Sequence, residues 1–446
     1  MRIMRSALTV AAGRAARRLA RLRGKGRGGS AFPGLVVERI DAGFLARTLE
    51  QLPLGVVVVS GTNGKTTTTK ILVELLRSQG LRVFTNPTGS NFVRGVAASL
   101  LTEVDARGRL DADIAVLELD EAHAVHFVRQ VRPRASLLLN VMRDQLDRFG
   151  EIDHTANLLH SVATATTELV VLNADDPRLA APRFTADLTA RVEGFGIGER
   201  LRRVFLSDDD LRRAEQEGPA MTEDAGLGTE QPEDAESAGT RLEAIDGRRA
   251  SLRVGGAEHE VEFALPGVHN MLNATGALAL ASSLLGERAD LDSLLHALSQ
   301  VRAAFGRGEM LEVEGRALEL ALVKNPAGFR MSLLSADTAP AETMIAINDD
   351  YADGRDMSWL WDVDFSALRA SGVHVVSGVR AFDMALRLRY DEVIVDGVET
   401  DLGAALGSLI AASRESGRPM RIFCTYTAML AVRAQLSRIT DVEVVL

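Results

Sequence analysis

A loop between an apolar run and an amphipathic run carries the residues best suited to chemistry. Val56–Val59 is continuously apolar, and a short segment with two glycines and one lysine follows after Ser60. Glycines let backbone N–H groups turn toward an anion, and the N-terminus of a following helix adds positive potential. This arrangement is typical of nucleotide phosphate binding. The loop residues are Gly61, Thr62, Asn63, Gly64, Lys65, Thr66 and Thr67.

Within this loop, Lys65 can reach the β- and γ-phosphates of a nucleotide, and the Thr66 hydroxyl can hold Mg²⁺. The spacing is compact, because Val59 stands where the general phosphate loop has its first glycine. The chain has four lysines and is otherwise basic through arginine. A lysine at this place therefore suits a point-charge contact with phosphate. The alternative is a glycine-rich turn that binds nothing.

Acidic residues follow another buried run, Ile114–Leu119. Because ligands of open parallel sheets bind at the carboxyl ends of strands, Glu118 is expected to face the loop and hold Mg²⁺. Asp120 and Glu121 follow directly. The alternative is a solvated cluster at a strand end. Two further polar segments come after predicted strands and would lie at the same edge, although their residues also form ordinary turns. These segments are Asn140–Asp147 and Asn173–Pro177.

The elements that position these residues alternate between buried strands and helices such as Thr66–Ser78, which predicts a parallel α/β sheet covered on both faces. A hairpin at Leu252–Leu265 and helices at Asn270–Leu285 and Leu291–Val301 follow. A second α/β unit starts near Phe305. The first set of predicted strands is Leu54–Ser60, Leu81–Thr85, Ile114–Leu119, Ala135–Val141 and Leu169–Asn173. The second set is Ala317–Val323, Thr343–Ile347, Val373–Val376, Glu392–Val395 and Arg421–Cys424.

Composition narrows the class of protein. A length of 446 residues with 46% apolar content suggests two or three domains with substantial cores. The net charge of −10 argues against a nucleic-acid-binding protein. The single cysteine, Cys424, excludes a disulfide framework and a multi-cysteine zinc site, and it fits a cytosolic protein.

Two segments have a charge bias. Residues 1–30 hold nine basic residues and no acid, with apolar residues placed on roughly one helix face, and Gly24–Gly34 is expected to be a hinge. The segment is a membrane-surface helix that senses anionic lipid, an export or transit segment, or a solvated basic helix packed on the body. Residues 207–240 hold eleven acids and are expected to be a flexible insertion, or else an acidic docking site. The apolar residues of the basic segment are Leu8, Val10, Ala11, Ala15, Leu19 and Leu22.

Several segments together resemble the Mur ligase and folylpolyglutamate synthase superfamily. The resemblance implies that Asn270, Asn273 and Arg307 join the loop in binding ATP, and that Arg307 and Lys65 are catalytic. The segments are Gly61–Thr67, Asn173–Pro177, Gly267–Ala274, Phe305–Glu309 and Lys324–Phe329.

Further segments resemble one branch, the MurT family, over roughly residues 30–446. This resemblance implies a basic arm and hinge at 1–45, a Mur-ligase middle domain of the P-loop ATPase type at 46–302, and a Rossmann-like Mur-ligase C-terminal domain at 303–446. The segments are Arg143–Glu151, Lys324–Phe329, Ala352–Asp362, Arg387–Tyr390 and Thr425–Met429.

The MurT resemblance implies a subunit of lipid II isoglutaminyl synthase, at the inner face of the plasma membrane. With ATP and Mg²⁺ it would activate the D-glutamate α-carboxyl of lipid II as an acyl-phosphate, and ammonia from a GatD-like glutamine amidotransferase would form D-isoglutamine. Cys424 lies in an apolar run and is expected to be a core thiol, so a partner is needed to make ammonia. Many relatives carry a four-cysteine zinc ribbon in the middle domain. Residues 207–240 take its place in this chain and contain no cysteine, so no zinc is expected. Several Mur ligases use a carbamylated lysine to help bind a second Mg²⁺. This chain has no lysine between Lys70 and Lys324, so the middle domain cannot use one.

Three aspartates lie in the segment Ala352–Asp362: Asp353, Asp356 and Asp362. The resemblance implies that one of them completes a catalytic arrangement with the amidotransferase cysteine and histidine, and we favour Asp356. The alternative is a loop carboxylate that caps a helix at Met357. Trp359 and Trp361 are interface anchors or core aromatics.

Two other functions fit parts of the sequence. One is a self-sufficient amino-acid ligase like folylpolyglutamate synthase, which would use a free amine without ammonia. The other is a nucleotide-gated scaffold whose basic arm docks on a membrane. Segments Asp353–Asp362 and Thr425–Met429 favour the amidating subunit over the self-sufficient ligase.

Overall fold

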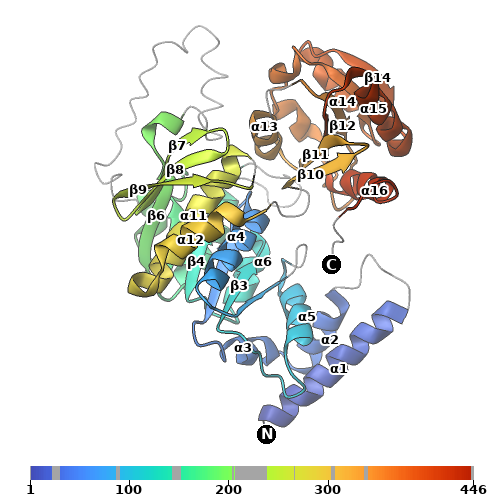
Figure 1. Cartoon of the computed structure of the whole chain (residues 1–446). Helices are drawn as coiled ribbons and strands as arrows, with labels where there is room; N and C mark the ends of the chain where they lie inside the picture. Colours follow the sequence, from blue (N-terminus) through green and yellow to red (C-terminus); the bar gives the residue numbers. More distant parts are fainter. Residues whose placement is uncertain are drawn as a thin grey trace. The chain divides into compact units, whose positions relative to one another are not determined.

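The computed structural model describes residues 2–22, 31–86, 91–142, 152–202, 205, 239–265, 267–302, 307–335 and 340–442. Two compact units, each with its own β-sheet, make up the chain (Figure 1). The predicted α/β class is confirmed. The first unit contains Met1–Val141, Ile152–Ala264 and Asn270–Val301, and the second contains Met142–Glu151, Leu265–His269 and Arg302–Leu446.

The sheet of the first unit has the strand order β2-β3-β1-β4-β5-β6-β7-β8-β9. Neighbouring strands are parallel from β2 to β7 and antiparallel from β7 to β9. The central strand β1 lies between β3 and β4, so the carboxyl ends of these strands lie at one edge. The strands are β1 Val56–Ser60, β2 Val83–Thr85, β3 Ile114–Glu118, β4 Ala135–Leu138, β5 Leu169–Asn173, β6 Arg191–Ile197, β7 Thr240–Asp246, β8 Arg249–Val254 and β9 Ala257–Glu262.

Helices cover both faces of this sheet, because successive side chains of a strand point to opposite faces. Val56 and Val58 pack into a core with α1, α2, α3, α5, α6 and α8. In Figure 1, α4, α11 and α12 lie on the other face. The helices are α1 Arg2–Leu22, α2 Ala31–Ile40, α3 Phe44–Leu49, α4 Lys65–Ser78, α5 Val93–Glu103, α6 Glu121–Val128, α8 Ile152–Ala165, α9 Pro182–Thr185, α11 Val268–Leu285 and α12 Leu291–Gln300.

The basic N-terminal segment forms a helix that packs on the body of the first unit. Val10 is buried in the same core as β1. The predicted apolar face was wrong for Val10, because Leu8, Ala11, Ala15 and Leu19 are exposed together on the side opposite Val10. The predicted hinge was wrong from residue 31 onward, because α2 begins there. Pro33 is tolerated because the first turn of a helix leaves its N–H groups without intrahelical partners.

None of the helices in the described ranges combines the length and the apolar character needed to cross a membrane. The predicted acidic insertion, 207–240, lies outside the described residues up to residue 238.

The second unit holds a sheet with the order β10-β11-β15-β12-β13-β14, in which β10 and β11 form an antiparallel hairpin and the other pairs are parallel. Its two faces build two cores: Ile345 packs with α13 and α14, and Met344 packs with α15 and α16. The elements are β10 Arg307–Val313, β11 Arg316–Leu322, α13 Pro326–Ser335, β12 Glu342–Ala346, η4 Ser358–Asp362, η5 Ser366–Leu368, β13 Val373–Ser377, α14 Ala381–Tyr390, β14 Val395–Glu399, α15 Leu402–Ser416, β15 Met420–Cys424 and α16 Tyr426–Leu436.

One predicted strand of the second unit is displaced. The sequence predicts a strand at Glu392–Val395, whereas β14 begins at Val395. Glu392 has a φ of 58°, so the chain turns there before the strand starts. Strands β6, β7 and β10 were not predicted, because their alternating or charged residues lack a continuous apolar run.

Helices α2 and α5 cross at Gly34, which generates a stability prediction. A Cβ atom at Gly34 would lie 2.0 Å from the backbone oxygen of Arg94. We expect Gly34→Ala to lower the free energy of unfolding by about 1–3 kcal/mol, because the two helices must move apart. Gly407→Ala in α15 is the matched control, since nothing lies within 4 Å of its Cβ position. Chemical denaturation measures both variants, and equal stability of the two would contradict the prediction.

Candidate active site

The loop after β1 is held by an asparagine that follows β4. The N–H of Thr62 donates to the backbone oxygen of Asn140 (3.0 Å), and the N–H of Asn63 donates to its side-chain oxygen (2.8 Å). The Asn140 amide in turn donates to the backbone oxygen of Asn63 (3.1 Å). Gly61 and Gly64 have φ values of 136° and 86°, which side chains rarely allow. The loop conformation therefore depends on both glycines and on a strand far away in the sequence.

Lys65 opens α4 and is buried, with 5% of its surface exposed. Its ammonium donates to the backbone oxygen of Gly61 (2.6 Å) and to Glu121 (3.2 Å), and it lies 3.2 Å from an Asp120 oxygen. A buried cation needs such partners to offset desolvation. Asp120 and Glu121 follow β3, which is the neighbour of β1. Glu121 is only 1% exposed, so it does not belong to a solvated cluster.

Thr66 and Glu118 meet directly at the same edge. The Thr66 hydroxyl donates to a Glu118 carboxylate oxygen (2.8 Å), and both residues are buried. The buried amide of Asn86 fixes the backbone of Glu118 from the other side, accepting from its N–H (3.0 Å) and donating to its oxygen (2.9 Å). The sequence analysis did not single out Asn86. A polar residue directly after the short strand Val83–Thr85 was the available signal.

A hydroxyl and a carboxylate are hard oxygen donors of the kind that Mg²⁺ prefers. Within the described ranges, no group of three or more His, Cys, Asp or Glu side chains is placed to hold a metal. Thr66 and Glu118 therefore fit a Mg²⁺ ion that completes its shell with phosphate oxygens and water.

The segment Asn173–Pro177 braces the edge of the sheet. The carboxylate of Asp176 accepts from the N–H groups of Val141 (2.7 Å), Arg178 (2.9 Å) and Leu179 (3.1 Å). Burial raises the pKa of Asp176, and these backbone hydrogen bonds oppose the rise. Asp176 thereby ties the end of β5 to the end of β4. The remaining acids predicted for this edge, Asp144 and Asp147, lie outside the described residues.

Helix α11 contacts the loop through Asn273. A Cβ atom on Gly64 would lie 2.4 Å from the Asn273 side-chain oxygen, so this amide lies against the loop backbone. Asn270 is one turn earlier on the same helix and is 2% exposed. The structure thus brings Asn273 to the N-terminus of α4, and its role in binding ATP stays a prediction. Thr67 is also buried, in the first turn of α4.

The candidate aspartates Asp353 and Asp356 of the second unit differ in burial and in hydrogen bonding. Asp353 is 2% exposed and accepts from the N–H and the hydroxyl of Thr427 (2.7 and 2.5 Å), which ties its loop to α16. Burial raises the pKa of Asp353, and the Thr427 hydrogen bonds oppose the rise. Asp356 is half-buried and accepts from the N–H of Ser358 (2.9 Å) at the start of η4. The side chain of Arg307 lies outside the described residues, and its backbone begins β10.

The two tryptophans of this segment have different environments. Trp359 is 5% exposed and packs against Phe329 in the core. Trp361 is 48% exposed, and its ring lies 5.2 Å from the ring of Tyr390. Cys424 is fully buried, which confirms the predicted core thiol, and burial raises its pKa above the usual range. A thiol that resists ionisation is a poor nucleophile.

Comparisons with known proteins agree with this geometry. Residues 59–281 match the Mur ligase middle domain, and residues 322–429 match the MurT ligase C-terminal domain. The MurT subunit of lipid II isoglutaminyl synthase (glutamine-hydrolyzing) from Streptococcus pneumoniae is 30% identical over 92% of this chain and 92% of its own length. The chain belongs to the MurT family. Another MurT subunit, from Staphylococcus aureus, is 27% identical over 84% of this chain and 85% of its own length.

Solved structures show the same fold in other Mur ligases. The MurF ligase of Thermotoga maritima in complex with ADP superimposes with a TM-score of 0.65 at 19% identity, covering 89% of this chain and 83% of that chain. The folylpolyglutamate synthase of Mycobacterium tuberculosis complexed with ADP and AMPPCP gives a TM-score of 0.60 at 15% identity, covering 89% and 93%. The predicted Mur-ligase fold of this MurT-family chain is therefore confirmed.

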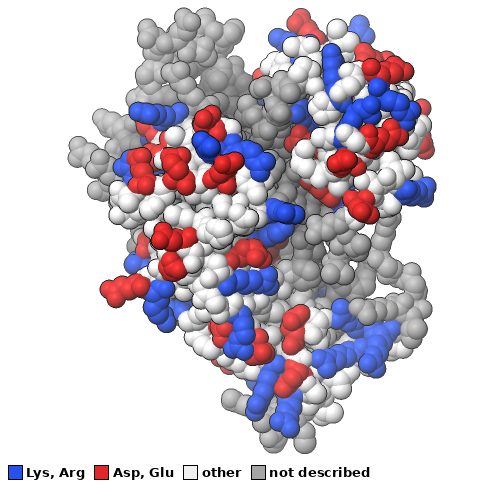
Figure 2. Space-filling model, in the orientation of Figure 1, with Lys and Arg blue, Asp and Glu red and all other residues white. Residues whose placement is uncertain are grey.

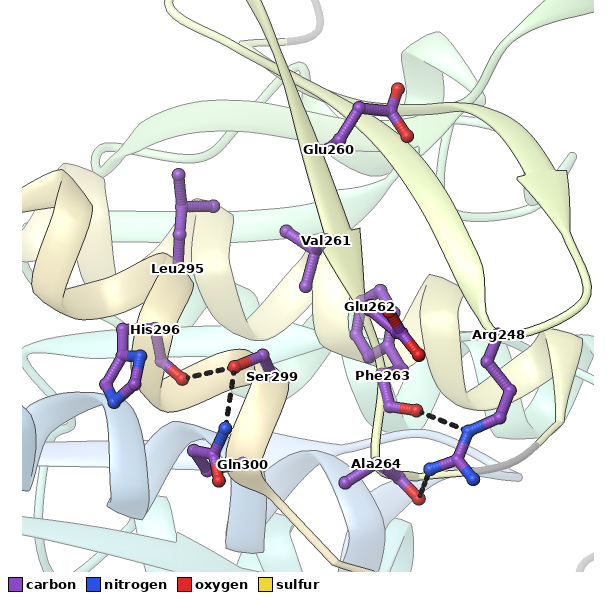
Figure 3. A pocket seen from close by; sticks show the side chains of 10 residues that line it. All are labelled: Arg248, Glu260, Val261, Glu262, Phe263, Ala264, Leu295, His296, Ser299 and Gln300. Atoms are coloured by element: carbon purple, nitrogen blue, oxygen red, sulfur yellow. Dashed lines mark hydrogen bonds between the residues drawn. The ribbon is translucent and has the colours of Figure 1, made fainter.

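A separate pocket of about 570 Å³ lies between β9 and α12 (Figure 3). Two of its polar side chains are already paired: Arg248 donates to the backbone oxygens of Phe263 and Ala264 (2.9 Å each), and Ser299 donates to that of His296 (2.8 Å). The loop residues and the strand-end carboxylates are not part of its lining. This pocket therefore does not include the residues that are predicted to bind the nucleotide in this MurT-family chain.

The site generates a prediction for its lysine. Lys65→Ala should lower ATP-dependent turnover by about a hundredfold or more, because the variant removes the positive charge beside the expected phosphate position. Lys70→Ala is the matched control, since it removes a lysine from the same helix at a position more than one turn beyond the loop. Steady-state phosphate release measures both. Comparable turnover in the two variants would show that Lys65 does not contact the nucleotide.

Proposed function

We propose that this chain activates the α-carboxyl of D-glutamate in the stem peptide of lipid II as an acyl-phosphate, which ammonia converts to D-isoglutamine. The observation that carries the proposal is the buried Lys65 ammonium, held between the loop backbone and the carboxylates that follow β3. The names of the MurT relatives, subunits of lipid II isoglutaminyl synthase, support the substrate.

The reaction uses two displacements. An oxygen of the substrate carboxylate attacks the terminal phosphorus of ATP, and ADP leaves. Ammonia then attacks the acyl carbon, loses a proton, and inorganic phosphate leaves with the former carboxylate oxygen. The acyl-phosphate is needed because a free carboxylate is a poor acceptor for an amine. The protein contributes mainly position and charge.

The residues proposed to bind ATP are those of the loop, together with Asn270, Asn273 and Arg307. Lys65 and Arg307 are proposed to neutralise charge on the transferred phosphoryl group. Thr66 and Glu118 would hold Mg²⁺, which supplies charge neutralisation of the phosphates when bound. Lys65 and the N-terminus of α4 orient the phosphates through the chain's own groups.

We propose that ammonia comes from a GatD-like glutaminase that docks on the second unit. The buried Cys424 supports the need for a separate glutaminase, because it is the chain's one thiol and is inaccessible. The docking surface is defined by exposed aromatic and aliphatic residues on α14 and η4, and we call it the α14 surface. It consists of Trp361, Phe382, Leu386 and Tyr390, which are 48%, 69%, 49% and 70% exposed.

The α14 surface has the character of an interface core. Phe382, Leu386 and Tyr390 are spaced four residues apart and share one helix face. Exposed aromatic residues of this kind are typical hot spots of protein interfaces. Asp356 lies five residues before Trp361 in the same segment, so a partner docked here would come close to it. Asp356 is therefore proposed to orient the catalytic histidine of the glutaminase.

Two broader features remain part of the proposal. The domain boundaries 46–302 and 303–446 follow the resemblance, with the middle domain carrying the nucleotide. The chain is proposed to work in the cytoplasm at the inner face of the plasma membrane, because its proposed substrate is a lipid-linked peptide.

The role of Asp356 is testable in the complex with the glutaminase. Asp356→Asn should lower glutamine-dependent amidation of lipid II by about a hundredfold or more, because the partner's histidine loses its orienting carboxylate. Amidation driven by ammonium chloride should be unchanged, because the ligase site is intact. Mass spectrometry of the stem peptide measures both.

Asp364→Asn is the control for Asp356→Asn, because Asp364 accepts from the N–H of Ser366 (2.8 Å) at the start of η5 in the same way. Loss of both activities in Asp356→Asn would indicate a structural role. Glutamine-dependent amidation by this chain without a glutaminase would contradict the proposed division of labour.

The docking surface makes a separate prediction. Phe382→Glu should weaken binding of the glutaminase at least tenfold, because it places a charge in the centre of an apolar contact. Ile439→Glu is the control, since Ile439 is 56% exposed on the same unit and lies outside the α14 surface. Isothermal titration calorimetry with the purified glutaminase compares them. Equal affinity of the two variants would place the partner elsewhere.

A further inference from the structure

Helix α1 turns one face to the first unit and the opposite face to solvent. The buried face consists of Thr9, Val10, Gly13 and Ala16. The solvent face carries apolar residues spaced three and four apart, which places them in one line along the helix. We call this line the outer stripe, and it consists of Leu8, Ala11, Ala15 and Leu19. The two leucines are 65% and 58% exposed.

Specific contacts fix which face points outward. The Arg14 guanidinium donates to the backbone oxygens of Leu101 (3.1 Å) on α5 and of Val104 (2.6 Å) just after it. The Thr9 hydroxyl donates to Asp41 (3.2 Å). Gly13 approaches Leu101 so closely that a Cβ atom would lie 2.6 Å from it. The helix therefore cannot roll to bury its outer stripe without breaking these contacts.

Positive charge surrounds the outer stripe. Arg5 and Arg18 are exposed on either side of it. Residues 1–30 contain nine basic residues and no acid, in a chain whose net charge is −10. Figure 2 shows Lys and Arg side chains along the part of the molecule where α1 lies. The N-terminal segment that contains α1 is thus basic throughout, in a chain that is acidic overall.

We propose that the outer stripe of α1 lies on the surface of a bilayer that contains anionic lipid. Leu8 and Leu19 would enter the boundary between headgroups and acyl chains, and the arginines would contact lipid phosphates. Either signal alone gives weak binding, whereas an apolar stripe and a basic cluster together give useful affinity. A nucleic acid would contact the arginines but would leave the exposed leucines without an apolar partner. The proposal goes beyond the proposed function, and its test needs no turnover.

The test is sedimentation of the full chain with vesicles. We expect the protein to sediment with vesicles of phosphatidylglycerol mixed with phosphatidylcholine, and not with phosphatidylcholine alone. The double variant Leu8→Glu/Leu19→Glu should bind the anionic vesicles at least tenfold more weakly. Added salt should weaken binding of the unmodified protein, because it screens the arginines.

Matched variants separate apolar contact from net charge. Val398→Glu/Ile439→Glu changes the net charge equally at two exposed positions of the second unit and should bind like the unmodified protein. Leu8→Ser/Leu19→Ser keeps the net charge and should still bind more weakly. Because both leucines are exposed, the thermal unfolding of all variants should match that of the unmodified protein.

A fluorescent reporter tests insertion directly. Leu19→Trp should show a blue-shifted emission on addition of anionic vesicles, relative to the unmodified protein, because the indole leaves water. Absence of vesicle binding would overturn the proposal. So would equal binding by the glutamate variant and its control, or binding to phosphatidylcholine alone of the same strength. If α1 bound the glutaminase and not the vesicles, the outer stripe would be a protein contact and the lipid proposal would be wrong.

Discussion

The ammonium of Lys65 is the charge on which the arrangement of the first unit's site depends. A cation with 5% exposure is stable only if its desolvation is offset. The Gly61 carbonyl and the carboxylates of Asp120 and Glu121 provide this compensation. They are in reach because β1 and β3 are parallel neighbours and end at the same edge. The sheet order thus decides whether the lysine can be buried beside a phosphate-binding loop.

Asparagine side chains hold the loop in the shape that such a site requires. Asn140 pairs with the backbone of Thr62 and Asn63, and Asn273 lies against Gly64. Amides suit this task because each can donate and accept without adding charge next to the phosphates. Asn86 does the same for the backbone of Glu118. Two segments distant in sequence therefore constrain one short turn, and a third constrains the carboxylate-bearing end of β3.

In the second unit, one candidate aspartate is buried and structural, and another is accessible. The Asp353 carboxylate accepts two hydrogen bonds from Thr427 and so joins its loop to α16. Asp356 instead lies near the surface beside η4. The same segment places Trp359 in the core and Trp361 at the surface, so one short 3-10 turn links packing to a candidate interface. The two units expose apolar residues of different kinds: mainly aromatic at the α14 surface and aliphatic, flanked by arginine, on α1.

Local sequence determined the continuously apolar strands, the loop and the family. Continuous apolar runs identify β1, β3, β4 and β5, because a strand that is covered on both faces carries apolar side chains on both faces. Two glycines and a lysine after such a run predict the phosphate loop, and the segments of the second unit predict MurT membership. The assignments of individual roles within the loop stay predictions.

Tertiary structure alone decided the pairings and the faces. Lys65 and Glu121 are 56 residues apart, and Asn63 and Asn140 are 77 apart, so their contacts follow from strand order and not from any local pattern. Val10 was wrongly placed on the same face of α1 as Leu8 for a related reason. Val10 and Leu8 are equally apolar, and only the position of α2 and α5 determines which of them is buried.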